Sequence, residues 1–346
     1  MATSNTAAVP EKSGAPAKSG ALRGNLLILG ATIFFGVNIP VVKFLNPEWL
    51  TSNDITLFRL GGGCILFWLA SLLTRGDNRI ARADFPRILA GGGLGLFAFI
   101  FLFNLSLRYA NPIDVSIIMT LPPVFVILIN VLFRHARPSW LELVGIILAF
   151  AGAVLVIMAR HTDMHASDAL LGNLLALASA LCYAIYLVVL EGPTHRYRPV
   201  SLLRWVFLAA FIPAIFLIGA FPHAPLFHAE GQTLTPWLMI AFVVVCPTFL
   251  AYLMVNPAIK LIGSVLVSIY QYLVPVIATI ASVLMGLATL RLPQILAMAA
   301  IIAGMLLTNL AKHRRQKILG QSASIKEEMY YLCGQVCCPA DFSSPQ

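Results

Sequence analysis

Polar side chains inside long apolar segments are the residues of this sequence whose types and spacing could do chemistry. Asn104 and Ser116 recur as Asn256 and Ser268 at one spacing of 152 positions. Amides and hydroxyls in such surroundings offer hydrogen bonds where water is scarce, although a single one more often joins two helices than binds a ligand. The set expected to line one central cavity is Asn38, Asn104, Ser116, Thr120, Tyr183, Tyr186, Tyr252, Asn256, Ser268, Tyr270 and Gln271.

Prolines form a second matched set. Pro122 and Pro123 lie inside one apolar segment, and Pro275 follows Pro123 by the same 152 positions. Proline lacks a backbone N–H and clashes with the preceding turn, so it breaks a helix and leaves carbonyls for a cavity or a neighbouring helix. The match predicts helix breaks that line or gate the cavity. Pro213 and Pro247 have no such match and are expected to be packing kinks.

The apolar segments themselves fix the class of protein. Apolar residues are 59% of the chain and charged residues 11%, and runs of about 20 apolar residues are long enough to cross the ~30 Å of hydrocarbon in a bilayer. We predict an all-α membrane protein in contact with the lipid bilayer. The ten expected transmembrane helices are 25–45, 54–74, 87–107, 113–133, 140–158, 171–190, 200–220, 236–256, 264–287 and 293–311.

The positive charges predict how these helices are oriented. With the N-terminus inside, the inner segments hold seventeen Lys and Arg and the outer ends hold four, and Arg59 and Arg204 inside helices complete the 23. Lys and Arg concentrate on the cytoplasmic side of membrane proteins, so both termini are expected in the cytoplasm, with the chain in the inner (plasma) membrane. The same rule explains the net charge of +9 without a nucleic-acid partner.

The constant spacing indicates an internal repeat. We expect a disordered tail at 1–24, one five-helix repeat at 25–158, a second at 171–311, and a cytoplasmic tail at 312–346. Five is an odd number, so the second repeat must enter the membrane inverted. Two inverted repeats with a site near the midplane are typical of secondary transporters.

The residues that catalysis, ATP-driven transport or proton coupling would need are missing from the expected positions. The sequence has no G-x-S-x-G, H-E-x-x-H or Walker motif, which argues against an intramembrane enzyme, and no catalytic residue, cofactor or metal site is predicted. Asp114 and Glu142 lie near helix ends, so no acid is expected at mid-membrane to couple protons. Arg59 and Arg204 are expected to extend to the nearest interface, with an anion contact as the alternative. We therefore expect a neutral or zwitterionic ligand.

Small residues predict close helix contacts. Gly145, Gly152 and Gly304 lie in the fifth and tenth helices, which could also form the seam of a homodimer. Leu in place of Gly93 or Gly152 is expected to lower the amount of folded protein.

The repeat unit resembles the EamA-type repeat of the drug/metabolite transporter superfamily. The match is carried by Phe35-Gly36 with Lys43, by Phe58-Arg59, and by the segments 107–133, 137–157 and 264–286. The resemblance implies ten helices in two inverted repeats, a cavity lined by helices 1, 3, 4, 6, 8 and 9, and export or exchange of small metabolites. It departs from the family at Ala136 and Ala288, where Glu is usual.

These expectations favour one function and leave two alternatives. The first is a secondary transporter of small neutral or zwitterionic, amino-acid-like metabolites that works by alternating access as an exporter. A flippase for lipids or lipid-linked sugars would use the same scaffold with a cavity open sideways to lipid. An intramembrane enzyme is the remote third.

Overall fold

The fold is built from helices in every part that the structure describes. The computed structural model describes residues 18–46, 48–74, 80–134, 139–158, 166–220, 234–255, 257–258, 261–262, 270, 272–304, 306–307 and 310. The first repeat holds α1 (Lys18–Leu45), α2 (Ser52–Leu73), η1 (Arg82–Asp84), α3 (Phe85–Leu89), η2 (Ala90–Leu96), α4 (Phe97–Tyr109), α5 (Pro112–Ile118), α6 (Pro122–Arg134) and α7 (Trp140–Met158). The second holds α8 (Ala166–Arg196), α9 (Pro199–Ala220), α10 (Leu234–Val243), η3 (Val244–Leu250), α12 (Leu273–Leu284) and an apolar helix at Leu292–Gly304.

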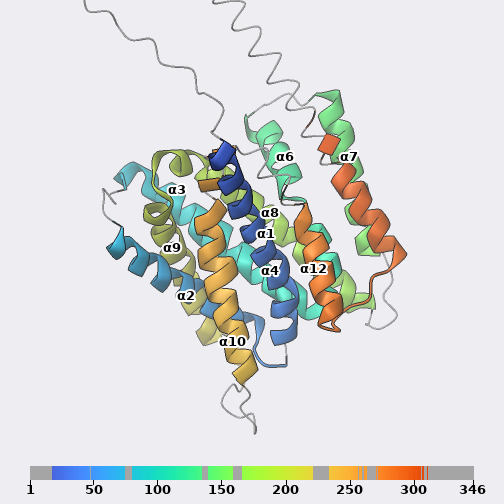
Figure 1. Cartoon of the computed structure of the whole chain (residues 1–346), viewed down its shortest axis with the longest axis horizontal. Helices are drawn as coiled ribbons and strands as arrows, with labels where there is room; N and C mark the ends of the chain where they lie inside the picture. Colours follow the sequence, from blue (N-terminus) through green and yellow to red (C-terminus); the bar gives the residue numbers. More distant parts are fainter. Residues whose placement is uncertain are drawn as a thin grey trace, which may run out of the picture.

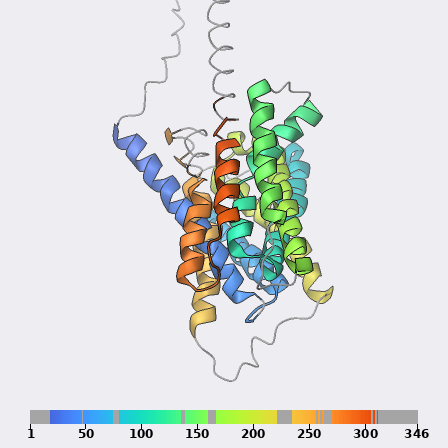
Figure 2. The same ribbon diagram turned by 90° about the vertical axis from the view of Figure 1, so that its right-hand side faces the viewer.

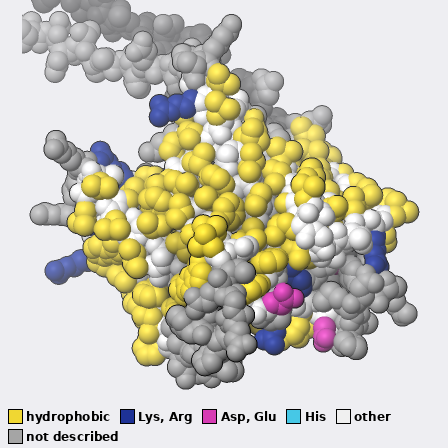
Figure 3. All heavy atoms as spheres, turned by 60° about the horizontal axis from the view of Figure 1, so that its bottom comes forward, with side chains coloured by type: hydrophobic (Ala, Val, Ile, Leu, Met, Phe, Trp, Pro, Cys, Tyr) yellow, Lys and Arg dark blue, Asp and Glu magenta, His cyan; other side chains and the backbone are white. Residues whose placement is uncertain are grey.

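The helices coincide with the predicted apolar segments. Seven helical stretches of the described chain are long and apolar enough to cross a membrane, and three shorter apolar helices accompany them, at Trp140–Leu155, Leu273–Leu284 and Leu292–Gly304. Apolar side chains cover most of the surface seen in Figure 3, with charged groups near its margins. Such a surface is stable in lipid, where apolar side chains lose nothing by exposure. The chain is a multi-pass membrane protein.

The acidic residues at helix ends act mainly as caps. Thr51 and Asp54 form a reciprocal capping box at the start of α2, in which the Asp54 amide donates to Thr51 Oγ1 at 3.2 Å. Ser139 and Glu142 do the same for α7, with 2.6 Å from the Ser139 amide to Glu142 Oε2. Caps satisfy backbone groups that the first turn leaves without partners. These two buried carboxylates therefore have a structural role.

The fourth segment is broken where the prolines predict a break. α5 ends at Ile118, and α6 begins at Pro122. The turn between them tightens, because the Leu121 amide donates to the Ile118 carbonyl at 3.0 Å. In the second repeat α12 begins at Leu273, so Pro275 lies in its first turn, where a missing N–H is tolerated.

The two repeats pack mainly against each other (Figures 1 and 2). α2 lies against α9 and α4 against α8, while α1 contacts α10, η3 and α12. α8 also contacts α5 and α6, as α1 contacts α12. Several contacts thus recur when the repeats are exchanged, although α4 packs more extensively on α8 than α10 and η3 pack on α1. The largest buried cluster lies at this junction and includes Leu45, Leu107 and Val124.

Glycines permit the closest approaches. A Cβ added at Gly92 would lie 2.5 Å from the Val206 carbonyl oxygen of α9, whereas one at Gly93 would meet only the Ala209 carbonyl oxygen at 3.5 Å. Gly92 therefore makes the closer approach to α9, because successive helical residues differ by about 100° in direction. The expected effect of Leu at Gly93 stays a prediction.

The expected homodimer seam is used within the chain. Cβ atoms added at Gly152 and Gly304 would lie within 3 Å of the Ala297 and Gly145 carbonyl oxygens respectively. The small residues therefore join α7 to the helix at Leu292–Gly304, which lie together at one edge of the molecule in Figure 1.

The first helix begins earlier than expected. α1 starts at Lys18, so residues 18–24 are helical and not part of a disordered tail. A Cβ at Gly24 would touch the Ile262 side chain, because this first part of α1 packs against residues 261–262. Residues 1–17 and the tail at 312–346 lie outside the described residues.

Candidate functional site

A central cavity of about 80 Å³ lies where the two repeats meet. This is several times the roughly 10–15 Å³ that one water molecule needs on the same measure. Its walls come from α1, α2, α4, the turn after α5, α8, the helical residues after η3, and α12. The lining residues are Phe35, Asn38, Ile39, Arg59, Phe99, Phe103, Met119, Tyr183, Tyr252 and Val274.

Arg59 is the charged group of this cavity. Its side chain is 3% exposed and stands over the Phe103 ring, with 5.8 Å from Cζ to the ring centroid. Its Nε donates to Thr248 Oγ1 at 2.9 Å, and its Nη1 is buried without a hydrogen-bond acceptor among the described residues. The expectation that Arg59 extends to the interface is wrong. It implied a site without a fixed charge, whereas this cavity carries one. Packing against the second repeat turns the side chain inward.

The π-helical segment η3 holds Arg59 in place. Pro247 has no N–H to donate to the Val243 carbonyl, and the Thr248 hydroxyl donates to that carbonyl instead, at 2.8 Å. This leaves Thr248 Oγ1 oriented to accept from Arg59. η2 is a π-helical segment in the corresponding helix of the first repeat, and such segments are frequent at functional sites. The sequence signals were the glycine run at 91–95 and Pro247, which was assigned to packing alone.

Arg204 is the repeat equivalent of Arg59, because Leu202-x-Arg204 matches Leu57-x-Arg59, but it lies elsewhere. Its guanidinium stands over the Trp68 and Trp205 rings, at 5.1 and 5.6 Å, and its Nη1 donates to Ser71 Oγ at 3.2 Å. It is not among the lining residues of the central cavity. The two arginines therefore occupy different environments despite their matched positions.

Aromatic rings and one amide complete the wall. The Phe99 and Tyr183 rings lie 4.6 Å apart, and Tyr252 meets Phe35 edge to face at 6.1 Å. Asn38 is 3% exposed, and its Oδ1 is buried with no hydrogen-bond donor among the described residues. A buried amide oxygen without a partner is costly, and at a cavity wall it can accept a hydrogen bond from a ligand.

A second cavity of about 130 Å³ adjoins the first and shares Phe35, Tyr183 and Tyr252 with it. We call it the end cavity, because it reaches Thr194 near the end of α8 and Pro199 at the start of α9. Tyr186 lines it, so this expected site residue lies beside the central cavity and not in it. The two cavities, which share these three wall residues, lie in succession between Arg59 and the α8–α9 junction.

Three expected site residues are held in contacts within and between helices. Asn104 is fully buried, and its Nδ2 donates to Thr56 Oγ1 at 2.9 Å. Ser116 and Thr120 donate to the carbonyls of Ile113 and Ile117, three residues earlier in each case. None of the three lines either cavity. A sequence cannot separate them from Asn38, because all four are polar residues in apolar helices.

The other expected residues fall outside the cavity wall or outside the described chain. Tyr270 packs beside the small buried cluster that includes Ile28 and Ala251. Asn256, Ser268 and Gln271 lie outside the described residues.

Hydrogen bonds close the molecule at the end opposite the α8–α9 junction. Lys43 Nζ donates to the Ala110 carbonyl at 3.1 Å, and Asn46 Nδ2 donates to the Asn104 carbonyl at 2.7 Å. Gln294 Nε2 donates to Asp114 Oδ1 at 2.6 Å, and Asp114 is only 1% exposed. These bonds join α1 to α4 and α5 to the last helix. We call this the α4–α5 end.

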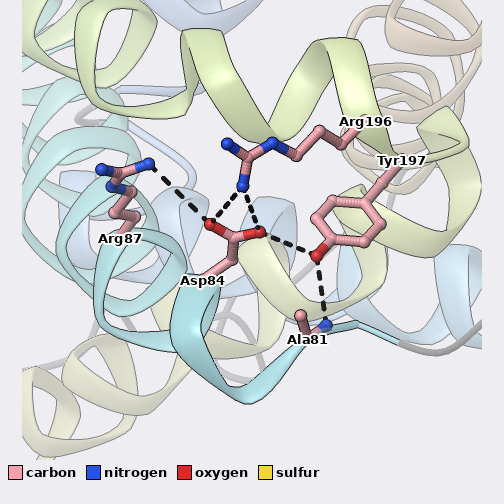
Figure 4. A network of polar contacts seen from close by, with 5 residues as sticks. All are labelled: Ala81, Asp84, Arg87, Arg196 and Tyr197. Carbon is pink, nitrogen blue, oxygen red and sulfur yellow. Dashed lines mark hydrogen bonds and ion pairs between the residues drawn. The ribbon is translucent and has the colours of Figure 1, made fainter.

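A charged cluster joins the elements at the α8–α9 end (Figure 4). Asp84 accepts from Tyr197 Oη at 2.8 Å and from Arg196 Nη1 at 3.2 Å, and Arg87 approaches it at 3.8 Å. Tyr197 Oη in turn accepts from the Ala81 amide at 3.1 Å. The cluster ties the start of the third segment to the α8–α9 junction, where Thr194 and Pro199 line the end cavity.

Comparisons with known proteins agree on one family. The model of the EamA-like transporter family matches residues 22–158 and again 170–310. An uncharacterized transporter of Archaeoglobus fulgidus is 25% identical over 66% of this chain and 77% of its own length. The uncharacterized transporter YyaM of Bacillus subtilis is 23% identical over 72% and 81%.

Two further matches are a relative whose name gives a substrate and a solved structure with a similar fold. A probable terminal-alkyne amino-acid exporter of Streptantibioticus cattleyicolor is 25% identical over 43% of this chain and 50% of its own length. A solved crystal structure at 20% identity has a TM-score of 0.58 over 86% of this chain and 98% of the other, which supports the fold. The chain belongs to the EamA-like transporter family and is a multi-pass membrane transporter of the EamA type, with the family unit present twice.

Proposed function

We propose that this protein exports small zwitterionic, amino-acid-like metabolites from the cytoplasm by alternating access. The observation that carries the proposal is the central cavity, whose wall combines Asn38 and Arg59 of the first repeat with Tyr183 and Tyr252 of the second. A ligand held by both repeats is released when the repeats move relative to each other. The relative from Streptantibioticus cattleyicolor, whose name gives an amino-acid exporter, supports the substrate class.

The proposed architecture has ten transmembrane helices in two inverted repeats. The packing of α2 on α9, and the matching contacts of α1 with α12 and of α8 with α6, support a two-fold relation between the halves. Five helices per repeat then place the second repeat upside down. The lysines and arginines of the two tails and of the segments after the second, fourth, sixth and eighth helices are assigned to the inside by the positive-inside rule. This puts both termini in the cytoplasm of a cell whose inner membrane holds the chain.

The proposed topology is tested with reporter fusions. A reporter inserted at residues 159–165, between α7 and α8, is expected to report a location outside the cytoplasm, and one inserted at 135–138 a cytoplasmic location. A cytoplasmic signal from the first insertion would exclude the proposed orientation.

The access path supports the direction of transport. In the proposed orientation the α8–α9 end faces the cytoplasm, so the end cavity lies between the cytoplasmic side and the central cavity that holds Arg59. The hydrogen bonds of Lys43, Asn46 and Gln294 hold the opposite end closed. The described conformation therefore fits a transporter that receives its substrate from the cytoplasm.

Reconstitution tests the function directly. The purified protein is placed in liposomes loaded with a mixture of the twenty common amino acids, and efflux of each is followed by mass spectrometry against liposomes without protein. Protein-dependent efflux of one or more amino acids is the expected result. Efflux of none, together with protein-dependent movement of a fluorescent phospholipid, would replace the proposal with the flippase alternative.

Association of two copies stays a prediction. The small residues of α7 are occupied within the chain, so the proposed homodimer would use outward apolar side chains such as Trp140 and Ile147. Cross-linking in membranes tests it.

A further inference from the structure

The guanidinium of Arg59 has no anionic partner in the described part of the protein. The described carboxylates that are buried are engaged elsewhere: Asp54 and Glu142 in caps, Asp84 with Arg196 and Tyr197, and Asp114 with Gln294. An arginine does not lose its proton in a protein, so Arg59 brings a full positive charge to the cavity. A buried charge is stable only when an opposite charge or hydrogen-bond acceptors compensate it.

Hydrogen bonding leaves one side of the guanidinium available. Nε is used by Thr248 at 2.9 Å, and Nη1 is buried without an acceptor. The fork of a guanidinium matches the two oxygens of a carboxylate. The bond to Thr248 fixes the plane of the guanidinium, so the remaining donors are held ready for a ligand.

The rest of the wall selects among anions. The lining residues near Arg59 are mostly apolar or aromatic, including Phe99, Phe103, Met119 and Val274, and Arg59 is the one Lys or Arg among them. A single cation suits a monovalent carboxylate better than a phosphate dianion, which needs more donors. Asn38 Oδ1, buried and without a donor, suits an N–H of the same ligand.

We propose that Arg59 is the anchor for the carboxylate of the transported molecule, and that the substrates are monocarboxylates with an apolar body, such as apolar α-amino acids. This inference rests on the proposed transport function and names its substrate class. Arg204 does not share the role, because it lies between Trp68 and Trp205, away from the cavity wall.

The test compares an acid with its amide in one vesicle. Liposomes containing the purified full-length protein are loaded with equal amounts of L-phenylalanine, L-leucine, L-phenylalaninamide and L-leucinamide, and efflux of all four is measured together. The wild type is expected to favour the acids by about tenfold or more, the size expected for one charge-assisted hydrogen-bond pair. Arg59→Gln is expected to abolish this ratio, while Arg59→Lys, which keeps the charge but loses the fork, gives an intermediate ratio.

Arg204→Gln is the matched control and is expected to keep the wild-type ratio. If Arg59→Gln fails to fold, the test rests on the ratio of acid to amide efflux in the wild type and in Arg59→Lys. The assay is then repeated with sulfate in place of chloride. If Arg59 anchors a carboxylate and not a chloride ion, the ratio of acid to amide efflux persists. Equal efflux of acids and amides by the wild type, or a ratio unchanged in folded Arg59→Gln, overturns the inference while transport stands. Efflux of none of the four, in protein that does move other amino acids, also overturns it, and efflux of nothing at all removes the proposed function.

Discussion

At the scale of single residues, two asparagines in apolar helices have opposite roles. Asn38 and Asn104 are both almost fully buried, and the Oδ1 of each has no donor among the described residues. Asn104 Nδ2 donates to Thr56 and joins two helices, whereas Asn38 lines the central cavity. An unsatisfied buried polar group lowers stability by about 1–3 kcal/mol. At Asn38 this cost falls on a residue of the cavity wall, where a ligand could supply the missing donor.

We predict that Asn38→Leu keeps or raises the melting temperature of the purified protein and slows transport. Leucine has a similar volume and removes the unsatisfied amide, but it also removes the acceptor from the cavity. Asn104→Leu is the control and is expected to lower the melting temperature, because it breaks an interhelical hydrogen bond worth about 0.6 kcal/mol on average in membranes. Thermal unfolding in detergent and efflux from liposomes measure the two effects. A marked loss of stability in Asn38→Leu would contradict the interpretation.

At the scale of elements, η2 places consecutive glycines against different neighbours. We predict that Gly92→Ala destabilises the protein by about 1–3 kcal/mol, the usual result of overpacking, because the new Cβ would lie 2.5 Å from the Val206 carbonyl oxygen. Gly93→Ala is the adjacent control. Its Cβ meets the Ala209 carbonyl oxygen at an ordinary 3.5 Å, and alanine favours the helix by about 0.5–1 kcal/mol. The melting temperatures should move in opposite directions, and equal losses would show that the α9 contact is not the cause.

The break between α5 and α6 belongs to the same scale. Pro123 has no N–H for the carbonyl of Met119, whose side chain lines the central cavity. We predict that replacing Pro122 and Pro123 together by alanine joins the two helices into one and slows efflux, with the protein still folded. Pro213→Ala, at a proline inside α9, is the control and should leave efflux near the wild-type rate. Unchanged efflux in the double variant would remove the break from the mechanism.

At the scale of the whole molecule, the two ends differ in access. In a variant whose own cysteines are serine, a cysteine replacing Leu203, which lines the end cavity, is expected to react with a membrane-impermeant thiol reagent from the cytoplasmic side. A cysteine replacing Leu60, which is fully buried and lines neither cavity, is the control and should stay unlabelled. Faster labelling of Leu203→Cys from outside would contradict the described access path.

The contacts of the closed end make a second test of the same idea. Gln294→Ala removes the 2.6 Å hydrogen bond to Asp114, and we predict that it raises outside labelling of a cysteine in place of Ile39, in the central cavity. The reason is that the closed state of the α4–α5 end loses a buried contact that the open state does not need. Labelling unchanged from the parent variant would exclude this bond as part of the closure.

The sequence by itself determined the features that depend on local order along the chain. Hydropathy over about 20 residues located the helices, because each segment must satisfy its own backbone hydrogen bonds in lipid whatever lies beside it. The break at Pro122 followed from a missing N–H, which is a property of the residue. The repeat was visible for the same reason, since a fixed spacing between Asn104 and Asn256 needs no knowledge of packing.

The tertiary structure alone decided which side of each helix faces the cavity. A helix turns about 100° per residue, and neighbouring helices set its rotation about its own axis. Packing against η3 turned Arg59 inward onto Thr248, whereas Arg204, at the matched position of the other repeat, rests on Trp68 and Trp205. Packing likewise gave Asn104 a partner and left Asn38 facing the cavity. The sequence alone therefore did not show that the site carries a fixed charge, because burial is a property of the assembled helices.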